Sequence, residues 1–354
     1  MTPFPGGLAP LGVCVLLAAL SAAVVRGMIG LAVMDVPGAR SAHARPVPRG
    51  GGAGLVAAIL AGVPALLALQ PAHGAPDKPW WRTGVLLGAV ALLAGVCWVD
   101  DRRGLRPGPK FLAQAAASVL AMAAAWAGWN AVPGGVPGAI AAGMVALGWM
   151  LFVVNAANFI DGLNGLAAGS TALCGALACV LATGSGMGGA FGLATAAGLA
   201  GFLPFNYPKA RIFMGDIGSQ VCGLVVGVLP LLALRNTAGT GTGWRIAIEA
   251  ALPVPLMFAG ILWDVLFTLG RRFLAGERLT QAHRGHLYQV AARCWLPPTA
   301  VAALYWGFVA WGAAMAVSLR DRPVAAAAGT MLPPLCWTVL VAARARRTGI
   351  GRWS

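Results

Sequence analysis

Long apolar runs with almost no charge constrain the fold of this chain more than any other feature. Of its 354 residues, 59% are hydrophobic and only 10% are charged. Several windows exceed about eighteen apolar residues, the length that a helix needs to cross the hydrocarbon core of a bilayer. A water-soluble protein of this size does not carry such windows. The sequence therefore predicts an all-α polytopic integral membrane protein.

The apolar runs define about eleven candidate transmembrane helices, joined by connections too short to fold as soluble domains. The approximate limits of these spans are 8–34, 51–70, 84–99, 111–129, 135–154, 163–183, 187–205, 217–234, 246–269, 299–318 and 324–343. Most of the 25 Lys and Arg residues fall in one set of loops. The positive-inside rule assigns those loops to the cytoplasm, with a periplasmic N-terminus and a cytoplasmic C-terminus. The net charge of +15 thus indicates topology, and no nucleic-acid partner is expected.

Acidic residues gather in the same cytoplasmic loops, although the positive-inside rule does not require it. They are Asp35, Asp100, Asp101, Asp161, Asp216, Asp264 and Glu277. Arginines, glycines and amides are interleaved with them. Mg²⁺ in such a setting takes one or two carboxylates together with phosphate oxygens. We therefore expect one transmembrane domain over residues 1–354, with loops near 35–50, 100–110, 155–165, 206–219 and 271–298 forming a site for a magnesium-bound polyphosphate.

The connection from Asn155 to Gly165 carries amides and a carboxylate where an ordinary short loop would carry turn formers and bases. If the preceding helix continues to Asp161, then Asn155, Asn158 and Asp161 lie three residues apart and share one helix face. An ionisable side chain at the edge of the lipid suggests a functional site. The alternative is a helix-capping Asp161 in a plain loop.

The first cytoplasmic loop combines bases with a glycine triplet. Arg40, His43 and Arg49 precede the triplet, and Gly51 is its centre. Guanidinium groups and bare backbone amides are what a phosphate-binding loop needs. An ordinary positive-inside loop would explain the arginines but neither the histidine nor the glycines.

The second loop places two adjacent carboxylates, Asp100 and Asp101, at the end of the third span, and Lys110 at the start of the fourth. Paired carboxylates can hold a divalent cation or act as an acid and base. The alternative is neutralisation by the neighbouring Arg102 and Arg103.

The fourth loop leads into a helix that starts with Asp216, so that backbone amides lie beside a carboxylate. That arrangement suits a metal–phosphate pair, with Asn206 and Arg211 nearby as phosphate or substrate ligands. The alternative is that Asp216 caps its own helix.

The fifth loop carries His283, Arg284 and His286. Because the carboxylates lie elsewhere and no cysteine joins the histidines, these side chains are expected to hydrogen-bond a phosphate or sugar. Solvated interfacial histidines are the alternative.

Five ordered motifs resemble a known family. They are the loop from Asp35 to Gly52, D-D-R at residue 100, N-A-A-N-F-I-D-G-L-N-G-L at residue 155, N-Y-P-K-A-R-I-F-M-G-D-I-G-S at residue 206 and H-R-G-H-L-Y-Q at residue 283. Together they resemble the polyprenyl-phosphate N-acetylhexosamine-1-phosphate transferases, glycosyltransferase family 4, of bacterial inner membranes. The span count and the fifth loop resemble the branch that initiates O-antigen and enterobacterial antigen.

The resemblance implies transfer of a sugar 1-phosphate from a UDP-N-acetylhexosamine to undecaprenyl phosphate, on the cytoplasmic face of the inner membrane. It implies Mg²⁺, with Mn²⁺ as the alternative ion, and it leaves open a monomer or a homodimer. The predicted roles are catalysis by Asp100, Asp101 and Asp161, and metal binding by Asp216 and Asp100. The predicted substrate and phosphate ligands are Arg40, His43, Arg49, Gly51, Lys110, Asn155, Asn158, Asn164, Asn206, Arg211, His283, Arg284 and His286. Asn164 stands where the family often has Asp.

Two other functions compete with this interpretation. A transporter of anionic lipid-linked or nucleotide substrates would place charges near the middle of the bilayer and would use interrupted helices. Here only Arg26 lies deep in a predicted span. The second competitor is another enzyme: either a lipid phosphotransferase that uses an alcohol-phosphate substrate, or the phospho-MurNAc-pentapeptide branch of the same family, which shares the catalytic loops.

Overall fold

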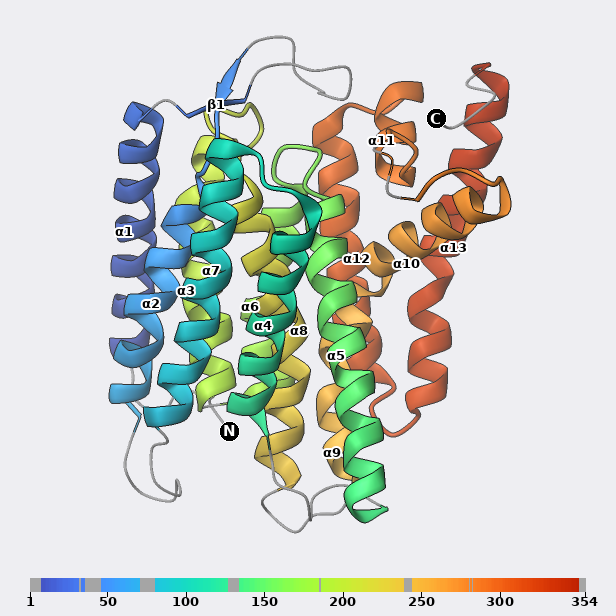
Figure 1. The fold of residues 1–354 in the computed structure, drawn as a ribbon. Coiled ribbons are helices and arrows are strands. Elements are labelled where there is room, and N and C mark those ends of the chain that lie inside the picture. Colours follow the sequence, from blue (N-terminus) through green and yellow to red (C-terminus); the bar gives the residue numbers. More distant parts are fainter. Residues whose placement is uncertain are drawn as a thin grey trace.

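The protein is a bundle of long, roughly parallel helices (Figure 1). The structure is a computed structural model and describes residues 8–31, 33–35, 46–70, 80–126, 134–184, 186–238, 244–279, 281 and 283–349. The first eight helical segments are α1 (Ala9–Leu31), α2 (Gly52–Ala68), α3 (Trp80–Arg103), α4 (Pro107–Ala125), α5 (Gly135–Phe159), α6 (Leu166–Ala178), the π-helical turn η2 (Cys179–Thr183) and α7 (Met187–Asn206). Those that follow are α8 (Asp216–Ala238), α9 (Trp244–Ala251), α10 (Pro253–Leu274), α11 (Leu287–Cys294), α12 (Pro298–Ser318) and α13 (Pro323–Arg347).

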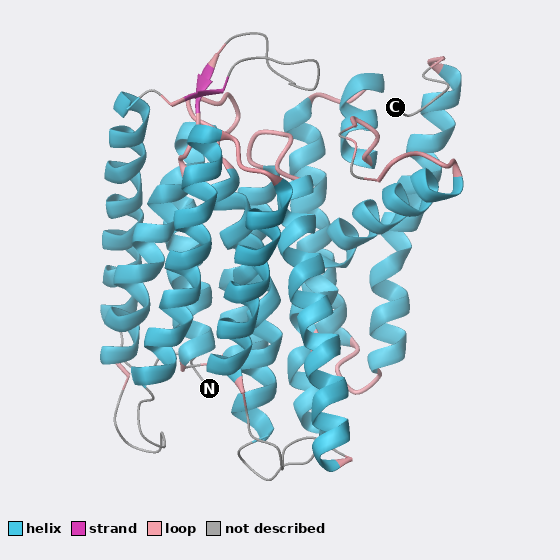
Figure 2. Cartoon of the chain, viewed as in Figure 1, coloured by secondary structure: helices cyan, strands magenta, loops and turns pink. Residues whose placement is uncertain are grey.

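Two short strands form a hairpin at one end of the bundle (Figure 2). They are β1 (Met34–Asp35) and β2 (Val47–Pro48), which pair antiparallel with Met34 opposite Pro48. The hairpin lies beside the start of α2, at the same end as α11 (Figure 1). The second strand leads directly to Arg49 and the glycine triplet.

The predicted all-α membrane class is confirmed. Eight helices within the described ranges are long and apolar enough to cross a membrane: α1, α3, α5, α7, α8, α10, α12 and α13. The other three predicted spans correspond to α2, α4 and the α6–η2 segment, which are shorter or less apolar. The eleven crossings and their orientation therefore stay predictions.

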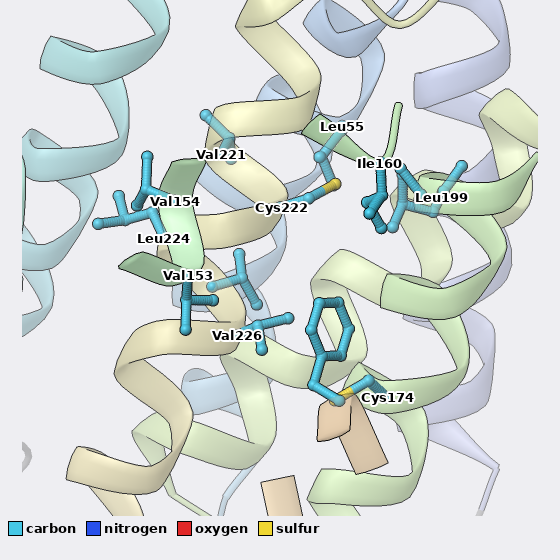
Figure 3. Close-up of a cluster of buried hydrophobic side chains, with 14 of the residues drawn as sticks. Leu55, Val153, Val154, Ile160, Cys174, Leu199, Val221, Cys222, Leu224 and Val226 are labelled. Atoms are coloured by element: carbon cyan, nitrogen blue, oxygen red, sulfur yellow. The ribbon is translucent and has the colours of Figure 1, made fainter. Parts of the chain in front are cut away.

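Helix α8 forms the centre of the bundle because its apolar side chains point in every direction. Of its most apolar window, 89% is buried, against 22% for α1 and 28% for α5 and α13, which lie at the edge. Figure 3 shows Val221, Cys222 and Leu224 of α8 among side chains from the surrounding helices, including Val154 of α5. A helix that is hydrophobic all round belongs inside a membrane protein, whereas outer helices can expose their leucines to lipid.

Glycine allows the starts of α2 and α8 to meet. A Cβ atom on Gly52 would lie 2.2 Å from Gly218 Cα, so only glycine fits at this contact. Close backbone approach of this kind is typical of transmembrane helix packing. The contact brings the first and fourth predicted loops, which are far apart in sequence, to the same place.

Candidate active site

A charged cavity of about 1200 Å³ opens at the end of the bundle where α5 and α7 end and α8 begins. Its walls come from the first, third, fourth and fifth predicted loops and from the end of α3. Four carboxylates and four basic side chains line it: Asp35, Asp101, Asp161, Asp216, Arg49, Lys209, Arg284 and Arg293. Four of the seven acidic residues expected at this end thus share one space with basic groups, whereas Asp100, Asp264 and Glu277 do not line it.

Asp216, the first residue of α8, lies in the wall of this cavity. Its carboxylate forms an ion pair with Lys110 and accepts hydrogen bonds from Asn158 Nδ2 at 2.9 Å and from Gln220 Nε2 at 3.4 Å. Gly215 precedes it with a φ of 73°, a conformation that favours glycine. Three elements of the fold therefore hold this carboxylate in one orientation.

Lys110 joins the second loop to the fourth. Its ammonium group lies between Asp216 and Asp100, with Asp100 Oδ2 at 2.9 Å. The other oxygen of Asp100 accepts the backbone N–H of Leu105 at 2.6 Å. Because Asp216 lines the cavity and Asp100 does not, Asp216 is better placed than Asp100 to hold a metal ion.

Asp101 caps helix α8 although it belongs to α3. Its side chain is 4% exposed and accepts the backbone N–H groups of Asp216 and Ile217, each at 3.2 Å. A carboxylate at a helix N-terminus satisfies free amides and interacts favourably with the helix dipole. Arg49 lies 3.9 Å away as its partner charge. Asp101 thus lines the cavity while positioning Asp216.

Asp161 follows α5, and its carboxylate oxygens are available to a ligand. No hydrogen bond or ion pair to its side chain is found within the described part of the chain. Burial raises the pKa of Asp161 well above its usual value, and the negative charges of Asp216 and Asp101 add to the increase. A carboxyl group of raised pKa in a cavity is a candidate for general acid–base chemistry.

Asn155 lies below the cavity. Its amide exchanges hydrogen bonds with Gln114 at 3.1 and 3.3 Å, and Gln114 Nε2 donates to Gln220 Oε1 at 3.0 Å. This buried network joins α4, α5 and α8, so the predicted substrate role of Asn155 gives way to a structural one. Sequence reasoning missed both glutamines, which a search for lone amides within apolar spans would have found.

Asn206 and Asn164 line the cavity, but their amide groups hold loops. Asn206 Oδ1 accepts the N–H of Gly165 at 2.6 Å, and its Nδ2 donates to the carbonyl of Ile212 at 3.0 Å. Asn164 Nδ2 donates to the carbonyl of Pro208 at 3.2 Å. These bonds join the third and fourth loops, so that the turn bearing Asp161 stays beside Asp216.

The glycine triplet has a different role from the one expected. The N–H of Gly51 donates to the carbonyl of Phe213 at 2.9 Å, and that of Gly52 to the carbonyl of Met214 at 2.9 Å. Both amides are hydrogen-bonded to backbone carbonyls and are not free to bind phosphate, which corrects the prediction for Gly51. Two other ligands predicted in this loop, Arg40 and His43, lie outside the described residues.

The fifth loop is anchored by a buried carboxylate. Asp264 of α10 is fully buried and accepts the N–H groups of Leu287 at 2.9 Å and Tyr288 at 3.1 Å and the hydroxyl of Tyr305. His286 Nδ1 lies 3.2 Å from Asp264 Oδ1, with the imidazole 4% exposed. His286 is therefore a structural partner of Asp264, which corrects its assignment as a phosphate ligand.

The remaining ligands predicted in the fifth loop differ in position. Arg284 lines the cavity, whereas His283 does not and instead stacks on His286 with ring centroids 4.9 Å apart. Gln289 and Arg293 on α11 line the cavity and were not predicted. They repeat at helical spacing after the histidine motif, which is the signal that would have found them.

One predicted phosphate ligand in the fourth loop lies outside the cavity. Arg211 is exposed, and its guanidinium group lies over the ring of Phe205. Its neighbour Lys209 lines the cavity in its place.

The donor atoms at this site suit a hard divalent cation that arrives with phosphate. Within the described ranges, no three His, Cys, Asp or Glu side chains converge as a complete metal site. Mg²⁺ needs only one or two carboxylates when phosphate oxygens complete its coordination. Asp216 already interacts with the ammonium of Lys110, which shows that a cation is stable there.

Comparison with known proteins shows that the chain is similar to a family of membrane transferases. The model of glycosyl transferase family 4 matches residues 83–234. A decaprenyl-phosphate N-acetylglucosaminephosphotransferase of Mycobacterium leprae (strain TN) is 31% identical over 339 residues, covering 86% of this chain and 84% of the relative. A probable undecaprenyl-phosphate N-acetylglucosaminyl 1-phosphate transferase of Bacillus subtilis (strain 168) is 26% identical over 75% of this chain and 71% of the relative. A phospho-N-acetylmuramoyl-pentapeptide-transferase of Moorella thermoacetica is 33% identical over 44% of this chain and 46% of the relative.

Proposed function

The chain belongs to glycosyl transferase family 4, the polyprenyl-phosphate hexosamine-1-phosphate transferases, and from this we propose its reaction. The protein transfers N-acetylhexosamine 1-phosphate from a UDP-N-acetylhexosamine to undecaprenyl phosphate and releases UMP. The observation that carries the proposal is the single cavity in which Asp161 and Asp216 face four basic side chains. A nucleoside diphosphate sugar needs such charge compensation, and a cavity of about 1200 Å³ has room for it.

The reaction requires one bond exchange at phosphorus. A phosphate oxygen of the lipid attacks the phosphorus that bears the sugar, and the bond from that phosphorus to the UMP oxygen breaks. The lipid gains a diphosphate-linked sugar, and UMP leaves with the bonding electron pair. Because the second pKa of a phosphate monoester is about 6, the nucleophile is largely ionised at neutral pH. Positioning and charge stabilisation then supply most of the catalysis.

The residues divide this work between metal binding, proton transfer and charge neutralisation. Asp216 would hold Mg²⁺, which supplies charge neutralisation on the diphosphate when it is bound. Asp161 would accept the residual proton of the lipid phosphate at its carboxylate oxygen. Arg49 and Arg284 would bind the diphosphate oxygens. Lys110 keeps Asp216 in place and carries a second positive charge beside it.

The extent of the matches supports a hexosamine donor over a pentapeptide-bearing one. The match to the mycobacterial N-acetylglucosamine relative covers nearly twice as much of this chain as that to the pentapeptide relative. Decaprenyl phosphate is the alternative acceptor that the mycobacterial name suggests. The protein is a multi-pass membrane enzyme, and we place its cavity on the cytoplasmic face of the inner membrane, because most bases lie at that end. Initiation of a surface glycan such as O-antigen stays the prediction for its pathway.

The experiment that tests the proposal is UMP release by membranes enriched in the protein. Undecaprenyl or decaprenyl phosphate, Mg²⁺ and a panel of UDP-sugars would be supplied to the wild type, Asp161→Asn and Asp216→Asn. Asp321→Asn is the matched control, because Asp321 is exposed at the opposite end of α12. We expect release that needs both lipid and metal and falls by at least about 10²-fold in the two site variants. Lipid-independent release, or equal activity in all variants, would refute the proposal.

Metal binding has a separate test. Calorimetric titration of the detergent-solubilised protein with Mg²⁺ in the presence of UMP should show binding that Asp216→Asn weakens. An unchanged Mg²⁺ affinity in that variant would remove Asp216 from the metal site even if its activity were lost.

A further inference from the structure

Two arginines lie over the ring of Phe205, outside the charged cavity. The guanidinium carbon of Arg26, on α1, lies 5.4 Å from the ring centroid, and that of Arg211, in the loop after α7, lies 5.3 Å from it. Both distances fall within the range of cation–π contacts. Both arginines are exposed, whereas the phenyl ring is 5% exposed. The two positive charges therefore lie on the surface and share one buried aromatic base.

Neither arginine has an acidic partner. Among the described residues, no carboxylate forms an ion pair with Arg26 or Arg211, whereas Arg49, Arg271 and Arg272 each have one. Neither residue lines the cavity. The two guanidinium carbons lie within about 11 Å of each other, because each is close to the same ring centroid. Two cations at such a separation repel, so an anion that contacts both would lower the free energy of the folded protein.

The fold fixes this arrangement. Helix α1 packs closely on α7, because Ser21 Oγ donates to the carbonyl of Gly198 at 2.7 Å and Gly201 leaves no room for a side chain beside Ala18. The N–H of Arg211 donates to the carbonyl of Phe205 at 2.8 Å. Both arginines are thus attached to the last turn of α7, and the site exists without a ligand.

Arg26 lies near the end of α1, at the same end of the bundle as Arg211. Arg26 is five residues before the end of α1, about 7.5 Å below it at the rise of an α-helix. The outer face of α1 exposes Leu11, Val15 and Leu16, and the helix stands at the edge of the bundle (Figure 1). A long basic side chain in this position extends toward the interface, where lipid phosphates are available.

We propose that Arg26 and Arg211 form a binding site for the phosphate group of an anionic phospholipid of the surrounding leaflet. Guanidinium groups bind phosphate oxygens in a bidentate manner, and a lipid with net negative charge compensates both cations better than a zwitterionic one. The acyl chains of this lipid lie along the apolar outer face of α1. This site is separate from the site of the transferred phosphate.

The site is also connected to the cavity wall. Asn206, the neighbour of Phe205, accepts the N–H of Gly165 and so holds the turn that carries Asp161. A lipid that fixes the end of α7 should therefore stabilise this turn. The expected result is a protein whose thermal stability responds to anionic lipid.

The experiment is a binding titration of the purified full-length protein with phosphatidylglycerol and with phosphatidylcholine, read by native mass spectrometry. The variants are Arg26→Gln, Arg211→Gln and the double substitution. Arg102→Gln is the matched control, because Arg102 is an exposed arginine that lies over a single aromatic ring, Trp98, at 5.6 Å. We expect each single variant to bind phosphatidylglycerol about tenfold more weakly, the loss of one charge-assisted hydrogen bond. Phosphatidylcholine binding and the control should be unaffected.

Three results would overturn the proposal. The double variant could retain wild-type affinity for phosphatidylglycerol, or Arg102→Gln could lose as much, which would indicate a diffuse basic surface. The third result comes from a titration with undecaprenyl phosphate. If the double variant no longer binds undecaprenyl phosphate but still binds phosphatidylglycerol, the site belongs to the lipid substrate. If the glutamine variants do not fold, Arg26→Lys with Arg211→Lys preserves both charges. This variant should retain preference for phosphatidylglycerol over phosphatidylcholine while binding it more weakly, and loss of that preference would count against the site.

Discussion

The carboxylate of Asp264 should be a principal determinant of both stability and cavity shape. Five groups converge on it: the N–H groups of Leu287 and Tyr288, the hydroxyls of Tyr305 and Thr268, and the His286 imidazole. In Asp264→Asn, one oxygen remains to accept from Leu287, but the new amide group faces Tyr288 and Tyr305. The buried N–H of Tyr288 is then left without an acceptor, and the Tyr305 hydroxyl loses its charged acceptor.

The magnitude follows from these two losses. An unpartnered buried donor costs about 1–3 kcal/mol and a lost hydrogen bond to a charged group about 1.5–3 kcal/mol, so we expect the folded state to lose about 3 kcal/mol or more. Tyr305→Phe should cost less, about 1.5–3 kcal/mol, because it removes one hydrogen bond to a charged acceptor and leaves the carboxylate its other partners. The two variants together thus give a graded series.

The assay is the thermal unfolding midpoint of the detergent-solubilised protein, compared at one scan rate because unfolding of such proteins is commonly irreversible. Nucleotide-sugar affinity is the second readout. Tyr288 Oη donates to the carbonyl of Phe159 at 2.9 Å, so loss of the Asp264 anchor should also displace the turn that carries Asp161. Asp321→Asn serves as the exposed control. A midpoint for Asp264→Asn equal to that of this control would refute the reasoning.

Three further predictions concern the charges at this end of the bundle. Lys110→Gln should lower UMP release by about 10²-fold and lower the unfolding midpoint, because Asp100 and Asp216 lose their shared cation; wild-type values of both would contradict the ion-pair argument. Burial lowers the pKa of His283 to about 4, and the charges of neighbouring His286 and two arginines add to the decrease. The ordinary pKa of an unfolded histidine is about 6.5. The contribution of neutral His283 to stability is therefore complete above about pH 6.5 and is lost as the pH falls toward 4. His283→Gln should flatten the dependence of the midpoint on pH in that window, and parallel curves would exclude the effect. The raised pKa of Asp161 should appear as an ionisation in the pH dependence of UMP release that Asp161→Asn removes while UMP affinity persists.

Sequence reasoning located the loops correctly because it relied on local properties. Hydropathy over a window is a property of adjacent residues, and the predicted spans match helices of the structure from α1 to α13. The clustering of acidic residues was visible for the same reason, since it depends only on which loops lie at one end. Asp101, Asp161 and Asp216 accordingly share one cavity.

Side-chain roles within those loops were harder to predict because they depend on the angular position of each group and on distant partners. Gly51 was assigned to phosphate because its amide looked free, but Phe213, far along the chain, accepts it. His286 was assigned to phosphate because Asp264, 22 residues earlier, was not known to face it. Arg26 had no assigned role until Phe205 and Arg211 were seen beside it.

The sequence by itself thus determined the membrane class, the approximate helices, the family and the end of the bundle at which acidic and basic residues gather. All of these follow from composition along the chain and from ordered motifs. Only the tertiary structure decided which carboxylate is free in the cavity, which one caps α8 and which one pairs with Lys110. Identical functional groups acquire different roles through their partners, and those partners meet only when helices distant in sequence pack together.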